Sequence, residues 1–167
     1  MSGRRPDQPT KTFPASFINS LAFSGNNRWL VAVESGSNGS PLLWDISDAS
    51  GAKPRTLTHS DFGQIRQTQI VRPATTTRDG RWLVYGIEKR LYVWRLDGLS
   101  NGTPPVAVKD LDERIGGLAI SPDDRWLAVY DRESAAARLF DLADLDCRSG
   151  ACGFESRRPR STQTPHP

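Results

Sequence analysis

The sequence contains few residues of the kinds that catalytic and metal sites need. Its 167 residues include two histidines, His59 and His166, and two cysteines, Cys147 and Cys152. The cysteines are separated by four residues, and no neighbouring Cys or His completes a zinc-ligand set, so we interpret them as free thiols. The sequence has no Gly-x-Ser-x-Gly, His-Glu-x-x-His or Gly-Lys-Ser/Thr motif. We therefore expect no enzyme activity, no metal site and no cofactor.

Long apolar runs and helix signals are also missing. No run approaches the ~20 apolar residues that span a bilayer, and Met1 to Ser16 lacks the apolar stretch of a secretory signal. No long 3.6-residue apolar period appears, and glycine and proline are frequent. These absences predict an all-β protein with no membrane association and a cytoplasmic location.

Positive charge is concentrated at the two ends of the chain. The formal net charge is +3, yet residues 17–146 carry 15 basic and 17 acidic side chains. The excess of basic residues lies in 1–16 and 147–167, which we interpret as a disordered arm and a disordered basic tail. A slightly acidic domain argues against nucleic-acid binding on its folded surface.

A repeat fills the middle of the chain. Its central copy, Arg81 to Leu96, predicts two strands, because Trp, Leu, Val and Tyr favour a pleated surface. Asp79-Gly80 just before it is a typical hairpin-turn dipeptide. The triplet Arg-Trp-Leu begins at residues 28, 81 and 125, so the copies are 53 and 44 residues apart. A four-stranded propeller blade takes ~40–45 residues, and Ser60 to Gln69 is the place for the insertion that lengthens the first interval.

The repeat predicts a series of short strands. They cover residues 17–23, 29–33, 42–46, 55–58, 68–71, 82–85, 91–96, 106–109, 115–120, 126–130 and 137–142, with a turn at 86–90. Asp123-Asp124 follows Ser121-Pro122, and this combination is typical of a turn rather than of a pair of catalytic carboxylates. All five tryptophans occupy repeat-equivalent positions, so we expect them to form the core between sheets.

The repeat can then be compared with a known family. Leu43-Trp44-Asp45-Ile46 and Leu139-Phe140-Asp141-Leu142 resemble the closing signature of a WD repeat, and Val93-Trp94-Arg95-Leu96 resembles a degenerate copy. The stretches Leu21 to Leu30 and Leu118 to Ala128 are similar to the first strand, turn and second strand of the same repeat. The resemblance implies a β-propeller that serves as a platform for protein contacts. The predicted blades are 17–59, 60–109 and 110–146.

The sequence departs from the family pattern at two points. The Gly-His dipeptide before the first strand is missing, and only His59, preceded by Thr58, lies near that position. The second repeat has Arg95 where the family has aspartate. We therefore expect irregular blades that are held together by packing more than by buried polar networks.

Three blades are fewer than a closed ring usually contains. Two open end faces would expose roughly 600 Å² of apolar surface, the upper limit for a soluble monomer. We therefore expect either a ring formed head to tail by several copies or a part of a longer propeller. The abrupt change in composition after Asp146 favours a truncated chain or a shifted reading frame.

The pattern predicts a non-catalytic scaffold for binding other proteins. Two alternatives remain: a regulatory sensor fragment of a larger signalling or effector protein, and a carbohydrate-binding propeller formed by oligomerisation. Candidate contact residues are charged loop positions, for which plain solvated surface charge is the alternative: Arg66, Arg72, Arg78, Glu88, Lys89 and Arg132.

Overall fold

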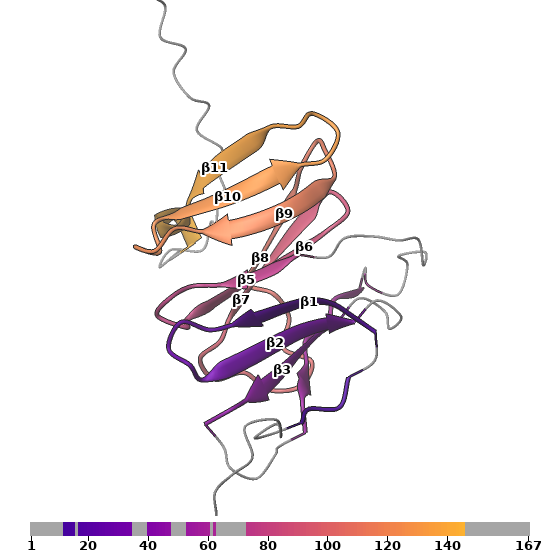
Figure 1. The fold of residues 1–167 in the computed structure, drawn as a ribbon, viewed down its shortest axis with the longest axis vertical. Coiled ribbons are helices and arrows are strands. Elements are labelled where there is room, and N and C mark those ends of the chain that lie inside the picture. Colours follow the sequence, from indigo (N-terminus) through magenta and orange to yellow (C-terminus); the bar gives the residue numbers. More distant parts are fainter. Residues whose placement is uncertain are drawn as a thin grey trace, which may run out of the picture.

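Three antiparallel β-sheets are stacked along the long axis of the molecule (Figure 1). The computed structural model describes residues 12–15, 17–34, 40–47, 53–60, 62 and 73–145. The first strands of successive sheets, β1, β5 and β9, contact one another. Helical structure in these ranges is limited to short 3-10 turns, at residues 60 and 62 and in η2 (Leu142–Leu145), so the expected all-β partial propeller is confirmed.

The strands follow one another within each sheet in sequence order. The first sheet contains β1 (Ile18–Phe23), β2 (Trp29–Glu34), β3 (Pro41–Asp45) and β4 (Arg55–Thr56); the second contains β5 (Ala74–Thr76), β6 (Trp82–Ile87), β7 (Arg90–Arg95) and β8 (Ala107–Asp110); the third contains β9 (Ile115–Ile120), β10 (Trp126–Asp131) and β11 (Ala137–Asp141). In the described part of the chain the third sheet has three strands, in line with the weak fourth-strand signal there.

Two local predictions differ from the structure in the second sheet. The strand expected at 68–71 lies outside the described residues, and the strand that pairs with β6 is β5, at 74–76. The turn expected at 86–90 is shorter, because only Glu88 and Lys89 separate β6 from β7. Glu88 adopts a left-handed φ of 52°, as the tight turns that join twisted strands require.

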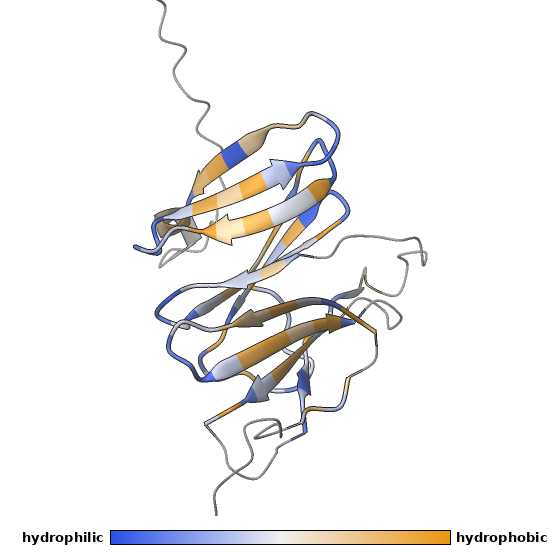
Figure 2. Ribbon diagram, viewed as in Figure 1, coloured by the Kyte–Doolittle hydropathy of each residue, from blue (hydrophilic) through white to orange (hydrophobic). Residues whose placement is uncertain are grey.

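The core lies between the sheets, and hydrophilic residues gather at the turns (Figure 2). The first interface packs Trp29, Val31 and Leu43 against Leu83, Tyr85, Tyr92 and Trp94; the second packs Val84, Leu91 and Val93 against Leu127, Val129 and Phe140. Strands β2, β6 and β7 are covered on both faces, which explains their continuous apolar runs. The predicted tryptophan core between sheets is confirmed for Trp29 and Trp94, whereas Trp82 and Trp126 are half-buried and Trp44 is buried on the outer face of the first sheet.

The outer face of the first sheet is less open than the sequence analysis expected. Trp44 is 1% exposed, and the ring of Phe13 packs on it with centroids 5.6 Å apart. Residues 12–15, which the sequence placed in a disordered arm, therefore include a side chain that covers this face. Leu21 and Phe23 of β1 remain 61% and 64% exposed. The expectation of two equally open apolar ends was thus wrong for the part of this face over β2 and β3.

Candidate interaction surface

One side of the molecule is formed by the turns that join the first and second strands of each sheet; we call it the turn face. Each turn starts with a serine or threonine whose hydroxyl donates to the side-chain oxygen two residues later and accepts from the N–H of the following tryptophan. The hydroxyl oxygen lies 2.6, 2.6 and 2.5 Å from the oxygen to which it donates, in the pairs Ser24–Asn26, Thr77–Asp79 and Ser121–Asp123. The backbone nitrogen of the tryptophan lies 2.8, 3.0 and 2.9 Å from the same hydroxyl oxygen, for Trp29, Trp82 and Trp126. The three blades therefore share a polar network that the sequence analysis did not predict.

The turns of successive blades also bind one another. Asn26 Nδ2 donates to the Asp79 carbonyl at 3.1 Å. The backbone N–H groups of Arg78 and Asp79 donate to the two carboxylate oxygens of Asp124 at 2.6 and 3.0 Å. Each turn thus fixes the position of the next, and the turn face is a continuous ladder across the three blades.

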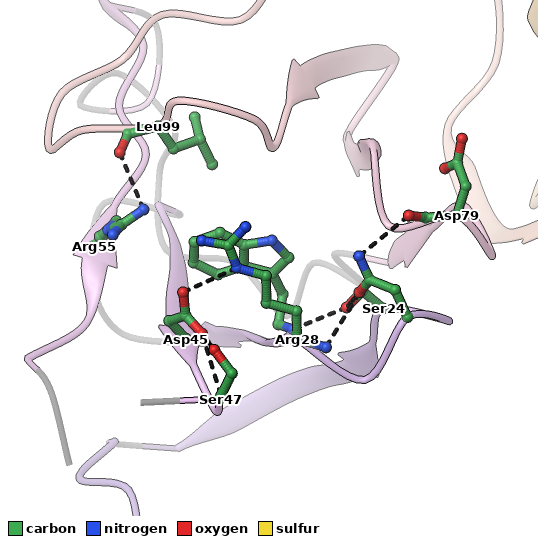
Figure 3. A network of polar contacts seen from close by, with 9 residues as sticks. Ser24, Arg28, Asp45, Ser47, Arg55, Asp79 and Leu99 are labelled. Atoms are coloured by element: carbon green, nitrogen blue, oxygen red, sulfur yellow. Dashed lines mark hydrogen bonds and ion pairs between the residues drawn. The ribbon is translucent and has the colours of Figure 1, made fainter. Parts of the chain in front are cut away.

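An arginine and an aspartate flank the buried tryptophan of the first blade. Arg28 Nε lies 3.0 Å from Asp45 Oδ2, and its guanidinium stacks over Trp29, 4.9 Å from the ring centroid (Figure 3). Burial disfavours the charged form of Asp45, but hydrogen bonds from Ser47 and Arg28 outweigh it and lower the pKa of the carboxyl group. The aspartate at this repeat position thus has a structural role here.

The opposite side of the molecule carries three connections from the second and third blades: the turn at 88–89, the segment 111–114 and the turn at 132–136. We call this side the loop face. Backbone hydrogen bonds join the connections, from Leu111 N to Lys89 O and from Ile115 N to Glu88 O, each 2.7 Å, and from Arg132 N to Arg114 O at 2.9 Å. The backbone of the loop face is therefore held in place before any partner binds.

The side chains of the loop face carry charges of both signs. Arg114 contacts Glu133 through its backbone N–H at 3.2 Å and its Nε at 3.6 Å. A hydrogen bond with Glu133 raises the pKa of Glu113, and the same bond lowers the pKa of Glu133. Lys89 Nζ donates to the Asp112 carbonyl at 2.5 Å. These contacts orient exposed charges without burying them.

An ion pair between a half-buried arginine and a buried aspartate lies next to the loop face. Asp131, at the end of β10, is fully buried, and its Oδ2 lies 2.8 Å from Arg138 Nε. Arg138 also reaches Asp112 at 3.4 Å, so one guanidinium links the core of the third blade to the segment 111–114. Among the described residues, Asp131 Oδ1 has no hydrogen-bond partner.

The structure brings together some of the predicted contact residues and separates others. Glu88, Lys89 and Arg132 lie on the loop face, where their connections meet. Arg78 lies on the turn face, at the other end of the strands. Arg66 and Arg72 lie outside the described residues. Four further charged residues of the loop face, Asp112, Glu113, Arg114 and Glu133, were not predicted, because no sequence signal pairs segment 111–114 with the turn at 132–136.

The described ranges contain no group of three His, Cys, Asp or Glu side chains that could hold a metal ion. No helix in these ranges is long and apolar enough to cross a membrane.

Comparison with known proteins agrees with the fold. Residues 7–45 match the WD40 family, described as "WD domain, G-beta repeat". Similar solved structures include the β-propeller domain of Myceliophteria thermophila Cps50 (Swd1), with a TM-score of 0.60 and 18% identity over 82% of this chain and 39% of that one. Kuenenia stuttgartiensis hydrazine synthase has a TM-score of 0.59 and 14% identity over 84% of this chain and 37% of that one. The structure of U3-55K has a TM-score of 0.57 and 16% identity over 77% of this chain and 37% of that one.

This chain therefore spans less than two-fifths of the length of each of these structures. At such low identity the likeness establishes the fold alone. No curated protein matches the sequence.

Proposed function

We propose that this chain, a set of WD-repeat β-propeller blades, is a non-catalytic scaffold that binds other proteins through its loop face. The blade bounds 17–59, 60–109 and 110–146 are part of the same proposal. Propeller folds of this family present loops of successive blades on a shared rigid surface, and the partners we infer are proteins rather than nucleic acids or membranes.

The observation that carries the proposal is the cross-linked backbone of the loop face. Three connections from two blades are joined by short hydrogen bonds, while Lys89, Arg114 and Arg132 remain exposed. A surface that is ordered before binding loses less conformational entropy when a partner docks. Charges of both signs on such a surface favour selection of one complementary partner over others.

The non-catalytic part of the proposal rests on the chemistry of the described residues. Three carboxyl groups have a lowered pKa, Asp45, Asp123 and Glu133, and the hydrogen bonds that each one accepts explain the shift. Hydrazine synthase is a structural neighbour named for an enzymatic activity, so the fold by itself does not decide the question.

The proposal is tested by exchanging charges on each side of the molecule. A loop-face variant, Lys89→Glu with Arg132→Glu, is compared with a turn-face control, Arg78→Glu, in cells that express the protein. Proximity labelling and cross-linking mass spectrometry are expected to place a partner against the loop face of the wild type and of Arg78→Glu, and to lose it in the loop-face variant. Identical labelling of all three proteins would contradict the proposal, provided that circular dichroism shows them equally folded.

A further inference from the structure

Among the described residues, each end sheet of the stack has one face that no other sheet covers (Figure 1). On the third sheet, Leu127 and Val129 of β10 pack against the second sheet, so the alternate residues of this strand point away from it. The strand register places Leu139 opposite Ala128 on the same outer face. Tyr130 and Leu139 are 46% and 51% exposed there. The outer face of the third sheet therefore presents apolar side chains to solvent.

The outer face of the first sheet is open over its first strand. The register places Leu21 opposite Ala32 and Phe23 opposite Leu30, and Leu30 and Ala32 belong to the apolar cluster on this face. Leu21 and Phe23 are more than half exposed. Both ends of the stack thus carry exposed apolar side chains, on different sheets and in different patterns.

Each of these faces is the repeat equivalent of one half of an interface that the molecule already forms. Leu139 of the third sheet is equivalent to Leu43 of the first, and Leu43 packs against the second sheet. Leu30, on the outer face of the first sheet, is equivalent to Leu83 of the second, and Leu83 packs against the first sheet. The outer face of the third sheet therefore corresponds to the surface that the outer face of the first sheet is built to meet.

The ring of Phe13 is compatible with another sheet on this face. Phe13, from the segment before the first sheet, packs on Trp44, and Phe62, from the segment before the second sheet, packs on the equivalent Trp94. Phe62 is 2% exposed because it belongs to the core between the first and second sheets, whereas Phe13 is half-buried. One blade along the stack, the position of Phe13 is thus inside a closed interface.

We propose that a second copy of this chain covers both open faces, with the outer face of its third sheet stacked on the outer face of the first sheet. Such a contact joins two different surfaces, so it stops adding copies only where a ring closes. Two copies with three sheets each lie within the range of about four to eight blades that close a propeller, and a closed dimer has two identical junctions. The turn face and the loop face stay open in this dimer, so the inference is independent of the scaffold proposal.

Sedimentation velocity of the full chain tests the assembly, and the wild type is expected to sediment with twice the mass of one chain. Leu139→Glu puts a charge on the third-sheet face, and Leu21→Glu puts one on the first-sheet face. Each variant is expected to sediment as a single chain, because an unpaired charge is costly to bury between sheets. Val108→Glu is the matched control: Val108 is 44% exposed in β8, the outer strand of the middle sheet, and this variant is expected to remain a dimer.

A mixture of the two blocked variants tests the direction of the stack. Leu21→Glu keeps an intact third-sheet face and Leu139→Glu keeps an intact first-sheet face, so the mixture is expected to form a dimer through one junction. This dimer is expected to dissociate more readily than the wild type, which has two junctions.

A wild type with the mass of one chain would overturn the second copy as the occupant of these faces, as would a dimer of either blocked variant alone. A mixture that contains only single chains, while circular dichroism shows both variants folded, would overturn the head-to-tail arrangement.

Discussion

At the scale of single residues, the turns show how far a sequence can be interpreted from local chemistry. Ser121-Pro122-Asp123-Asp124 predicts a turn, and Asp124 indeed adopts a left-handed φ of 56° there. The equivalent Asn27, with φ of 57°, ends a turn that begins at Ser24 rather than at a Ser-Pro pair. What the sequence could not show is that the Asp124 carboxylate also binds the backbone of the preceding blade, because that contact depends on how the sheets stack.

The hydroxyl at the start of a turn is expected to matter most where it is buried. Ser24 is fully buried and is the acceptor for the buried N–H of Trp29, so Ser24→Ala is expected to cost about 1–3 kcal/mol of unfolding free energy. Ser121 is half-buried, and Ser121→Ala is expected to cost about 1 kcal/mol. Urea denaturation of both variants measures the difference. A loss no larger in Ser24→Ala than in Ser121→Ala would contradict the assigned role of burial.

The turn carboxylates are expected to make stability depend on acid pH. Hydrogen bonds from the Ser121 hydroxyl and the Arg125 N–H lower the pKa of Asp123 below its ordinary value of 3.8. A lowered folded-state pKa gives stability that is complete above the ordinary value and is lost as the pH falls through the folded-state value. Asn26 performs the same acceptor role in the first blade, so Asp123→Asn is expected to keep the turn and to lose less stability between about pH 5 and pH 2.

Denaturation curves of the wild type and Asp123→Asn, measured across this pH range, check the prediction. Parallel loss of stability in the two proteins would show that Asp123 does not contribute.

At the scale of elements, the sequence predicts the strands with tryptophan, leucine and valine within one or two residues of their bounds, and the short outer strand β4 begins where it is predicted but ends two residues earlier. The sequence predicts a strand at 55–58; Arg55 and Thr56 pair with β3, and Leu57 N donates to the Pro41 carbonyl at 3.0 Å. The loop after β7 binds the backbone of Thr56: Thr56 N donates to Asn101 Oδ1, and Gly102 N donates to the Thr56 carbonyl, each at 3.1 Å. This loop covers the free edge of β4, and no local signal in either segment reveals a contact across 45 residues.

The ladder of turns depends on close backbone approach at Gly25. A Cβ atom at this position would lie 2.4 Å from the Cα and carbonyl oxygen of Arg78, so the first and second blades would have to separate. We expect Gly25→Ala to destabilise the protein by about 1–3 kcal/mol, as overpacking does. Gly117→Ala in β9 is the control, because its Cβ would meet only an ordinary contact at 3.9 Å. Thermal unfolding of the two variants decides the matter; equal midpoints would contradict the ladder.

At the scale of the whole molecule, the repeat spacing predicted the architecture, but not which surfaces remain open. A propeller usually closes with about four to eight blades, so a complete ring needs blades in addition to these three, from a longer chain or from other copies. Nothing in the sequence distinguishes the two end faces, because the polar composition of 1–16 gives no sign that Phe13 packs on Trp44. A single aromatic residue in a polar segment does not show which surface of the protein it packs on, so the contact of Phe13 with Trp44 could not be predicted.

Phe13 is expected to stabilise the first blade by covering its outer face. Phe13→Ala removes a half-buried ring, so it is expected to cost about 1–3 kcal/mol, less than the ~3–5 kcal/mol of a fully buried phenylalanine. It is also expected to make Trp44 accessible to acrylamide. Phe17→Ala is the matched control, because Phe17 is 86% exposed and its removal should leave stability unchanged. Equal effects of the two substitutions on denaturation and quenching would contradict the covering role.

The central feature of this fold is the coverage of its sheets on both faces: the second sheet lies between two blades, and the first lies between the second blade and Phe13. Hydrogen-exchange mass spectrometry of the native chain tests this directly, because amides in the most stable part of a structure exchange only through its global opening. The structure predicts that β2, β6 and β7 exchange slowest and as one group, and that β11, in the three-stranded sheet, exchanges faster. Rapid and uniform exchange in all of these strands would contradict it.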